Sequence, residues 1–206
     1  HFVTPGETLQ SKGRSIFAGG KGLNQSVALA RAGGDVYHAG AVGKADGQIL
    51  INVLTENKIN SDFLKQRDEA SGHTIIQVDD NGQNCIILYG GSKKNNTTKG
   101  IYENLSPFLN GGYFFWQNET NNIEYMINKA YEKGLKVCFN VSPYSDELLK
   151  LPLDKCSYLI VNEIEGSSMV SKPADTDPYE LIDELTKKYP NSSFVLTLGS
   201  RGSILK

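Results

Sequence analysis

The stretch YFFWQNETNNIEYMINKAYEKGLKVCFN, residues 113–140, holds a complete strand–helix–strand pattern. Residues 113–117 form an apolar run of strand length, and residues 123–133 place apolar side chains at helical spacing. Gly134 can end that helix in the left-handed conformation, and a second apolar run follows at residues 136–139. Two strands joined through a helix are typical of parallel pairing in a sheet that helices cover.

The same alternation extends in both directions from this stretch. Gly33-Gly34 is expected to end a helix, whereas Asp46 and Asp177 are expected to cap the starts of two others. Further strands are predicted at residues 36–42, 158–161 and 194–197, and further helices at residues 23–32, 46–57 and 178–189, with a short one near residues 146–149. The pattern predicts an α/β chain with a mostly parallel sheet.

One region departs from this alternation. Residues 74–78 and 85–89 are apolar runs on either side of Asp79-Asp80-Asn81-Gly82. Asn-Gly between two strand-like runs is the strongest short signal for a β-hairpin, so an antiparallel insertion is expected here. The polar segment that follows, residues 93–98, is expected to be a loop.

The composition of the chain indicates which kinds of binding partner to expect. The 206 residues carry a formal net charge of −2, which gives no excess of basic charge for nucleic acid or an anionic membrane. No apolar run reaches the roughly 18 residues of a membrane span, and the first residues do not resemble a signal peptide. Three widely separated cysteines predict neither a disulfide framework nor a zinc site. A cytoplasmic protein with a small-molecule partner is expected.

Both ends of the chain look cut. It does not begin with Met, and the final residues, 203–206, have the apolar character of a strand interior. We therefore expect a fragment of a longer protein.

Polar residues cluster where the predicted strands end. They are Gln117-Asn118-Glu119, Asn140, Asn162-Glu163-Ile164-Glu165 and Thr197-Leu198-Gly199-Ser200. The carboxyl ends of parallel strands share one edge of a sheet, and ligands bind at that edge in open α/β sheets. The sequence therefore predicts a small-molecule site there, without indicating a reaction.

A glycine-rich motif precedes the first helix. Gly19-Gly20-Lys21-Gly22-Leu23-Asn24-Gln25 has the spacing of neither the mononucleotide P-loop nor the dinucleotide fingerprint. Its glycines permit close backbone approach to a ligand, and Asn24 offers donors and acceptors for hydroxyl groups. The alternative is a plain glycine-rich turn that enters a helix.

Five motifs, taken in order, resemble those of ribokinase-like carbohydrate kinases, and most closely those of ribokinases. They are residues 4–9, 19–25, 42–47, 162–165 and 197–202. The resemblance spans essentially the whole chain. It implies a ribokinase-like three-layer sandwich with a mostly parallel central sheet and a small antiparallel β lid. The implied organisation is one truncated domain over residues 1–206, with lid segments at about 8–17 and 73–90.

The resemblance also assigns sugar-binding residues. Gly19 and Gly20 would be the hinge and floor of the sugar pocket, and Lys21 and Asn24 would bind sugar hydroxyls. Glu119 would be a further sugar contact, since a carboxylate can accept hydrogen bonds from two hydroxyls. The alternative for Glu119 is a surface carboxylate near a helix start.

The nucleotide site follows in the same way. Asn162 would contact the phosphates of ATP, and Glu165 would help to hold Mg²⁺ through water. The pocket itself would be shaped by Thr197, Gly199, Ser200 and Gly202. Asn162 as a helix cap and residues 197–202 as a tight turn between strands are the alternatives.

The implied reaction is transfer of the γ-phosphoryl group of ATP to a hydroxyl of ribose or a related sugar. The family's base is the Asp of a Gly-Ala-Gly-Asp motif, which does not occur up to Lys206. We therefore name no catalytic residue and expect the chain alone to be inactive. The resemblance further implies a homodimer formed through the lid, and it leaves activation by a monovalent cation open.

Two alternatives to a ribose kinase remain. One is a nonenzymatic sugar-binding or regulatory protein of the same fold. The other is a nucleoside or phosphosugar kinase, because Lys93 and Lys94 could face a phosphorylated substrate.

Overall fold

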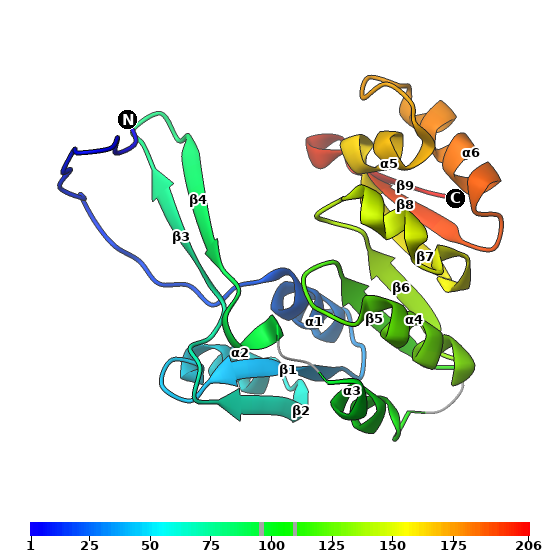
Figure 1. Cartoon of the computed structure of the whole chain (residues 1–206), viewed down its shortest axis with the longest axis horizontal. Helices are drawn as coiled ribbons and strands as arrows, with labels where there is room; N and C mark the ends of the chain where they lie inside the picture. Colours follow the sequence, from blue (N-terminus) through cyan, green and yellow to red (C-terminus); the bar gives the residue numbers. More distant parts are fainter. Residues whose placement is uncertain (95–96, 109–110) are drawn as a thin grey trace. The chain divides into compact units, whose positions relative to one another are not determined.

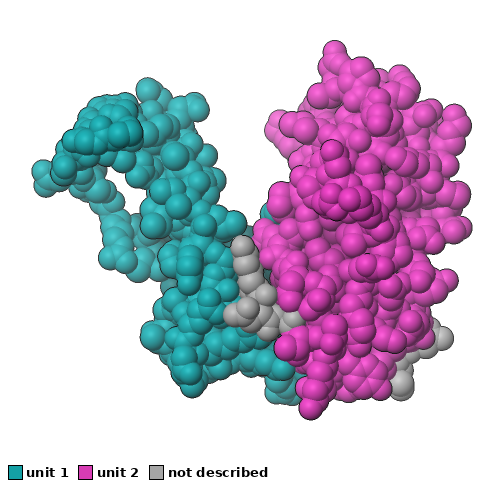
Figure 2. Space-filling model, in the orientation of Figure 1, with its two compact units in different colours: residues 1–95 teal, residues 96–206 magenta. Residues whose placement is uncertain are grey.

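The computed structural model describes residues 1–94, 97–108 and 111–206, which form two compact units, residues 1–95 and 96–206 (Figure 2). Asn95 and Asn96, in the predicted loop at residues 93–98, lie outside the described residues. The single domain expected over residues 1–206 stays a prediction, because compactness alone does not define a domain.

The second unit is built on a sheet whose strand order follows the sequence (Figure 1). Its first four strands are parallel and β9 pairs antiparallel with β8. The strands are β5 (Tyr113–Gln117), β6 (Lys136–Asn140), β7 (Tyr158–Asn162), β8 (Ser193–Thr197) and β9 (Ser203–Leu205). All five fall where the sequence predicted strand character.

One helix precedes the first of these strands, and other helices and 3₁₀ turns connect them. Asp177 accepts hydrogen bonds from the amides of Tyr179 and Glu180, which confirms the predicted cap at the start of α6. The α-helices are α3 (Thr98–Leu105), α4 (Ile123–Glu132), α5 (Glu163–Val170) and α6 (Pro178–Lys188), and the 3₁₀ turns are η2 (Asp146–Lys150), η3 (Leu153–Lys155) and η4 (Gly199–Arg201).

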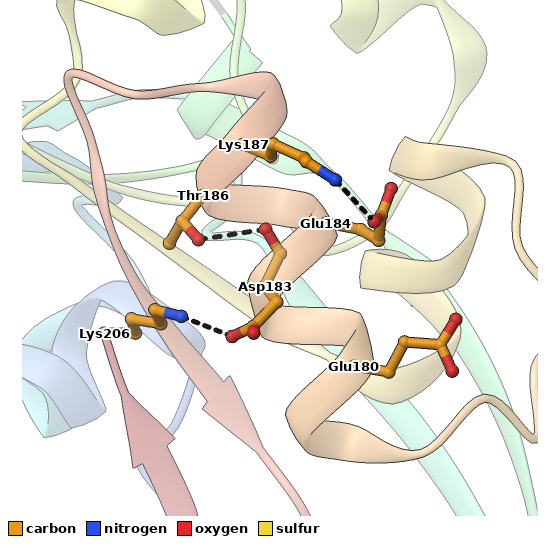
Figure 3. A pocket seen from close by; sticks show the side chains of 6 residues that line it. All are labelled: Glu180, Asp183, Glu184, Thr186, Lys187 and Lys206. Atoms are coloured by element: carbon orange, nitrogen blue, oxygen red, sulfur yellow. Dashed lines mark hydrogen bonds and ion pairs between the residues drawn. The ribbon is translucent and has the colours of Figure 1, made fainter.

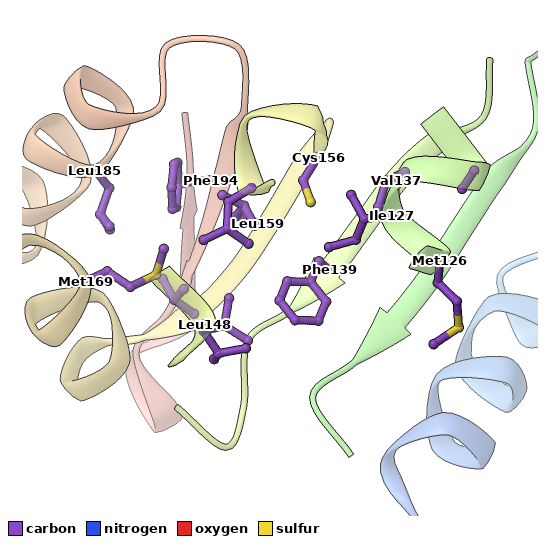
Figure 4. Close-up of a cluster of buried hydrophobic side chains, with 14 of the residues drawn as sticks. Met126, Ile127, Val137, Phe139, Leu148, Cys156, Leu159, Met169, Leu185 and Phe194 are labelled. Carbon is purple, nitrogen blue, oxygen red and sulfur yellow. The ribbon is translucent and has the colours of Figure 1, made fainter. Parts of the chain in front are cut away.

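One face of this sheet carries the core of the second unit. Phe139, Leu159 and Phe194 are 0% exposed and pack with apolar side chains from all four α-helices (Figure 4). The strand register puts Phe115 and Ile160 on the opposite face, where they are half-buried. The strands are thus apolar on both faces, as parallel strands usually are.

The first unit has a smaller α/β body. In it, β1 (Tyr37–Gly43) pairs parallel with β2 (Asn60–Arg67). The helices α1 (Lys21–Arg31) and α2 (Gln48–Glu56) accompany them, and the buried cluster consists of Leu23, Leu54 and Ile59. The expected cap at Asp46 is wrong. Gly47 is the N-cap of α2 without a side-chain hydrogen bond, because the Asp46 carboxylate is bonded to Ser71 instead.

The predicted hairpin is confirmed in the first unit. β3 (His73–Val78) and β4 (Asn84–Tyr89) pair antiparallel, and the Asp79 carboxylate accepts from the amides of Asn81 and Gln83 in the turn. No residue of either strand is buried. A 3₁₀ turn, η1 (Gly91–Lys94), follows. The predicted α/β class, with a mostly parallel sheet and a small antiparallel element, is confirmed.

Within the described residues, no helix has the length and apolar character needed to cross a membrane.

Candidate functional site

Two predicted nucleotide residues lie side by side at the ends of neighbouring strands. Asn162 ends β7, Thr197 ends β8, and the two are register partners in the parallel pair. The Thr197 hydroxyl donates to the carbonyl oxygen of Val161 at 3.2 Å, which fixes its side chain between the strands. Gln117 and Asn140 are likewise partners at the ends of β5 and β6. The polar residues therefore share one sheet edge, as predicted.

Asn162 and Glu165 bond to each other at the start of α5. The Asn162 Oδ1 accepts from the Glu165 amide at 2.8 Å, and the Glu165 carboxylate accepts from the Asn162 amide at 3.0 Å. This capping box satisfies two amides that a helix start leaves without partners. The helix-cap alternative for Asn162 is thus observed. It fixes the position of both side chains beside Thr197.

Residues 198–202 form the tight turn between β8 and β9. Gly199 and Gly202 have φ angles of 58° and 93°, a region that favours glycine. The Leu198 amide donates to the Gly202 carbonyl oxygen at 2.8 Å, which closes the turn. Ser200 is exposed at its tip. Gly199, Ser200 and Gly202 lie in this turn, and Thr197 is the last residue of β8 before it. The four predicted pocket residues therefore lie in one short segment.

Arg201 was not singled out from the sequence. Its guanidinium forms an ion pair with Glu163, in the first turn of α5. This contact joins the β8–β9 turn to the helix that Asn162 caps. The opposite charges of Glu163 and Arg201 were visible in the sequence, but only the register of β7 and β8 brings them together.

The predicted sugar residues are divided between the units. Gly20 is the N-cap of α1 with φ of 103°, and Lys21 and Asn24 lie in the first turn of that helix. Gly19, Gly20 and Asn24 are exposed, and Lys21 is half-buried. Glu119 belongs to the second unit, where its amide donates to the Gln117 carbonyl oxygen at 2.9 Å. The structure groups the first four but leaves their relation to Glu119 a prediction.

A metal ion at Glu165 would need ligands from water and phosphate in addition to the protein. Across residues 1–94, 97–108 and 111–206, no three His, Cys, Asp or Glu side chains gather in a way that could hold a metal ion. Glu165 is 8% exposed and gives one carboxylate oxygen to the helix cap. One carboxylate supplemented by water and phosphate oxygens fits the coordination habits of Mg²⁺.

A hollow lies beside α6 (Figure 3). It is lined by Glu180, Asp183, Glu184, Thr186, Lys187 and Lys206. Ion pairs join Glu184 to Lys187 and Asp183 to Lys206. Glu180 pairs with Lys172, which lies outside the lining. None of the predicted site residues lines this hollow.

The model of the pfkB family of carbohydrate kinases matches residues 1–206. The chain belongs to this family. Ribokinases that resemble the chain in sequence and ribokinases of solved structure both agree with the ribokinase-like fold expected from the motifs.

Among relatives of this pfkB family chain, the ribokinase of Arabidopsis thaliana is 28% identical over 210 residues, covering 97% of this chain. The ribokinase of Haemophilus influenzae is 28% identical and covers 98% of this chain. The chain spans 55% of the length of the first relative and 67% of the second.

Solved structures share the fold. Ribokinase from Cryptococcus neoformans var. grubii serotype A, in complex with ADP, superposes with a TM-score of 0.84 at 30% identity, over 100% of this chain and 70% of that one. Arabidopsis thaliana ribokinase, complexed with ribose and ATP, gives 0.79 at 24% identity, over 100% of this chain and 68% of that one. The ribokinase-like fold is confirmed.

Proposed function

We propose that the full-length protein containing this chain phosphorylates a hydroxyl of ribose or a related sugar with ATP. The observation that carries the proposal is the shared edge at which Asn162, Glu165 and the turn at residues 198–202 meet, in a chain of the pfkB family. The bound ribose, ATP and ADP in the named ribokinase structures support it.

Each predicted residue has a role in this proposal. Gly19 and Gly20 allow the backbone to approach the sugar, while Lys21, Asn24 and Glu119 bind its hydroxyls. The side-chain NH2 group of Asn162 donates to phosphate oxygens, while its Oδ1 keeps the helix cap. Thr197, at the end of β8, and the turn residues Gly199, Ser200 and Gly202 line the nucleotide pocket. Positioning and charge stabilisation of this kind supply most of the catalysis in phosphoryl transfer.

Glu165 is the proposed metal residue. Bound Mg²⁺ would neutralise charge that develops on the transferring phosphoryl group. The carboxylate of Glu165 would orient water molecules around the ion while its other oxygen keeps the helix cap. None of these residues takes the proton of the sugar hydroxyl, and a monovalent cation remains a further candidate activator.

Two helix caps provide a matched test of the nucleotide site. Replacing Asn162 or Asp177 with Ala removes an N-cap in the same unit, and each change should cost about 1 kcal/mol of stability. Only Asn162→Ala should also raise the KM for ATP, by about tenfold or more, because a hydrogen bond to a charged group is lost. Equal KM values in the two variants would remove Asn162 from the ATP site.

The substrate class is tested on the full-length protein with ATP, Mg²⁺ and a panel of ribose, fructose, ribose phosphates and nucleosides. Ribose turnover that collapses in Asn24→Ala supports both the reaction and the sugar pocket. Preference for a nucleoside or phosphosugar would replace ribose as the substrate. Sugar binding without any turnover would favour a nonenzymatic binding protein.

The hairpin supports a homodimer as part of the proposal. Ile75 and Ile87 are partners on one of its faces, Ile76 and Ile86 are partners on the other, and all four are 54–57% exposed. Exposed apolar patches mark interaction sites, and in this proposal one face of the hairpin covers the substrate while the other packs against a second copy. Lys12, in the other predicted lid segment, forms an ion pair with Asp80 at the hairpin turn.

Ile75→Lys and Ile76→Lys separate the two faces. Sedimentation should show that one variant is monomeric, whereas the other stays dimeric and has a raised KM for the sugar. If both variants sediment as the unmodified protein does, pairing of two copies through the hairpin is wrong.

A further inference from the structure

The β3–β4 hairpin has no core of its own to orient it. Its residues are exposed or half-buried, and an isolated two-stranded hairpin is marginally stable in water. Figure 1 shows it extending from the body that contains β1, β2 and α2. Its direction must therefore be set where the chain enters and leaves it.

The segment leading into the hairpin is held by Asp46. The Asp46 carboxylate accepts from the Ser71 hydroxyl at 2.6 Å and from the Ser71 amide at 3.0 Å. The Ser71 hydroxyl in turn accepts from the Gly43 amide at 2.8 Å. Ser71 is 6% exposed, whereas Asp46 is exposed, so the bond between Gly43 and Ser71 is buried and the bonds to the Asp46 carboxylate are partly buried. The end of β1 is thereby tied to the root of β3.

The segment leaving the hairpin is held by Ser92. Its hydroxyl donates to the Ala41 carbonyl oxygen at 3.1 Å, and its amide donates to the Ala70 carbonyl oxygen at 3.0 Å. The Arg67 guanidinium donates to the Ser92 carbonyl oxygen at 2.8 Å. Ser92 is 0% exposed. Both roots of the hairpin are therefore bonded to the last residues of β1.

Two glycines make this close approach possible. A Cβ on Gly43 would overlap an Asp46 carboxylate oxygen and lie 2.8 Å from the Ser71 amide nitrogen. A Cβ on Gly91 would lie 2.6 Å from the Ala70 carbonyl oxygen. Backbone rather than flexible side chain fills most of this space, so the clamp leaves little room for other arrangements.

We propose that Asp46 is a positioning residue for the β3–β4 hairpin, holding it through Ser71 at a fixed angle to the β1–β2 body. Two ionised side chains bond directly to the hairpin roots, Asp46 to Ser71 and Arg67 to Ser92, and bonds to ionised groups are the stronger ones. Of the two, Asp46 accepts from both the hydroxyl and the amide of Ser71. Its role in sugar binding depends on the proposed function, whereas its role in hairpin orientation does not.

The chain offers a native site for a reporter. Cys85 lies on β4 and is exposed, whereas Cys138 and Cys156 are buried. A fluorophore attached to Cys85 reports hairpin motion through its anisotropy. Asp46→Ala should lower this anisotropy, and Ser71→Ala should do the same because it breaks the clamp from the other side. The anisotropy of Asp46→Asn should lie between the values of these two variants and the value of the unmodified chain. The side-chain carbonyl oxygen of Asn can still accept a hydrogen bond from Ser71.

Asp68→Asn is the matched control. Asp68 is also a carboxylate near this loop, but it pairs with Lys44 at the surface with 92% of its side chain exposed. Its removal should leave the anisotropy unchanged. Measurements over a range of protein concentrations separate the clamp from pairing between copies, and circular dichroism checks that each variant is folded.

The positioning role fails if folded Asp46→Ala and Ser71→Ala both keep the anisotropy of the unmodified chain. In the full-length protein, Asp46→Ala should raise the KM for the sugar more than the KM for ATP. Lowered anisotropy without any sugar turnover in the unmodified protein would keep the clamp and reject the kinase, so the two proposals can fail separately.

Discussion

The sheet of the second unit and the hairpin of the first are made of similarly apolar strands, yet they differ completely in burial. Phe139 on β6 is 0% exposed, whereas Ile86 on β4 is 56% exposed. The helices between successive strands of the sheet fold back over one of its faces, while the short turn of the hairpin provides no such cover. Apolar strand composition therefore predicts a strand but not what covers it.

The largest expected difference comes from truncating one residue in each region. Phe139→Ala should destabilise the second unit by about 3–5 kcal/mol, because it leaves a cavity in a closed core. Ile86→Ala should change the free energy of unfolding by at most about 0.5 kcal/mol, as exposed positions do. Urea unfolding measures both. A large cost at Ile86 in monomeric protein would mean that the hairpin is covered within the chain.

Backbone crowding distinguishes the root of the hairpin from exposed loops. Gly43→Ala should cost about 1–3 kcal/mol, because the added methyl group would overlap the Asp46 carboxylate and backbone atoms. Gly13→Ala is the control, since nothing lies within 4 Å of its added Cβ. Thermal unfolding of the two variants tests this, and equal melting temperatures would contradict a tight hairpin root.

Acid should weaken the two units differently. Burial lowers the pKa of His38 below 6.5, and its ring nitrogen bonds to the Ser26 hydroxyl at 2.8 Å. The unfolded chain then binds the proton first, so the stability of the first unit is complete above about pH 6.5 and falls as the pH drops toward the lowered pKa. The second unit contains no histidine.

Hydrogen exchange followed from about pH 7.5 to pH 5.5, with correction for intrinsic rates, resolves the two units. Protection of β1 should decline more than protection of β6. His38→Gln should flatten the decline, because its side chain does not titrate. A parallel decline in both units would point to carboxylates rather than His38.

The smallest expected effect is on the reactivity of the cysteine thiols, with no change in stability. Burial raises the pKa of the Cys138 and Cys156 thiols to about 12, so both stay protonated and unreactive near neutral pH. Cys85 in the hairpin is exposed. One thiol per folded chain should react quickly with a thiol reagent, and Cys85→Ser should abolish that phase without changing stability. Rapid modification of all three would show that the core opens readily.

The elements that could be predicted are those with a clear period or a clear terminus. The apolar runs of the sheet and the Asp177-Pro178 helix start were enough to place them. β2 (Asn60–Arg67) was missed, because its sequence NSDFLKQR is mostly polar and only its pairing with β1 makes it a strand. α3 (Thr98–Leu105) was missed because it is short and contains Gly100.

The contacts described above also include some that the sequence could predict and some that it could not. The shared edge of Asn162 and Thr197 followed from parallel pairing, which needs only the alternation of elements. The bond between Asp46 and Ser71 did not, because it joins residues 25 positions apart. Local rules favoured Asp46 as a helix cap. Only the folded first unit shows that its carboxylate has a different partner.

The strand order of the second unit bears on how the chain folds as it is made. Every strand from β6 to β9 pairs with the one that precedes it in the sequence. A ribosome releases these strands in the order in which the sheet grows, so each new strand meets an edge that already exists. No earlier strand has to wait for a distant partner, which keeps loop-closure costs low and shortens the time for which apolar edges stay open.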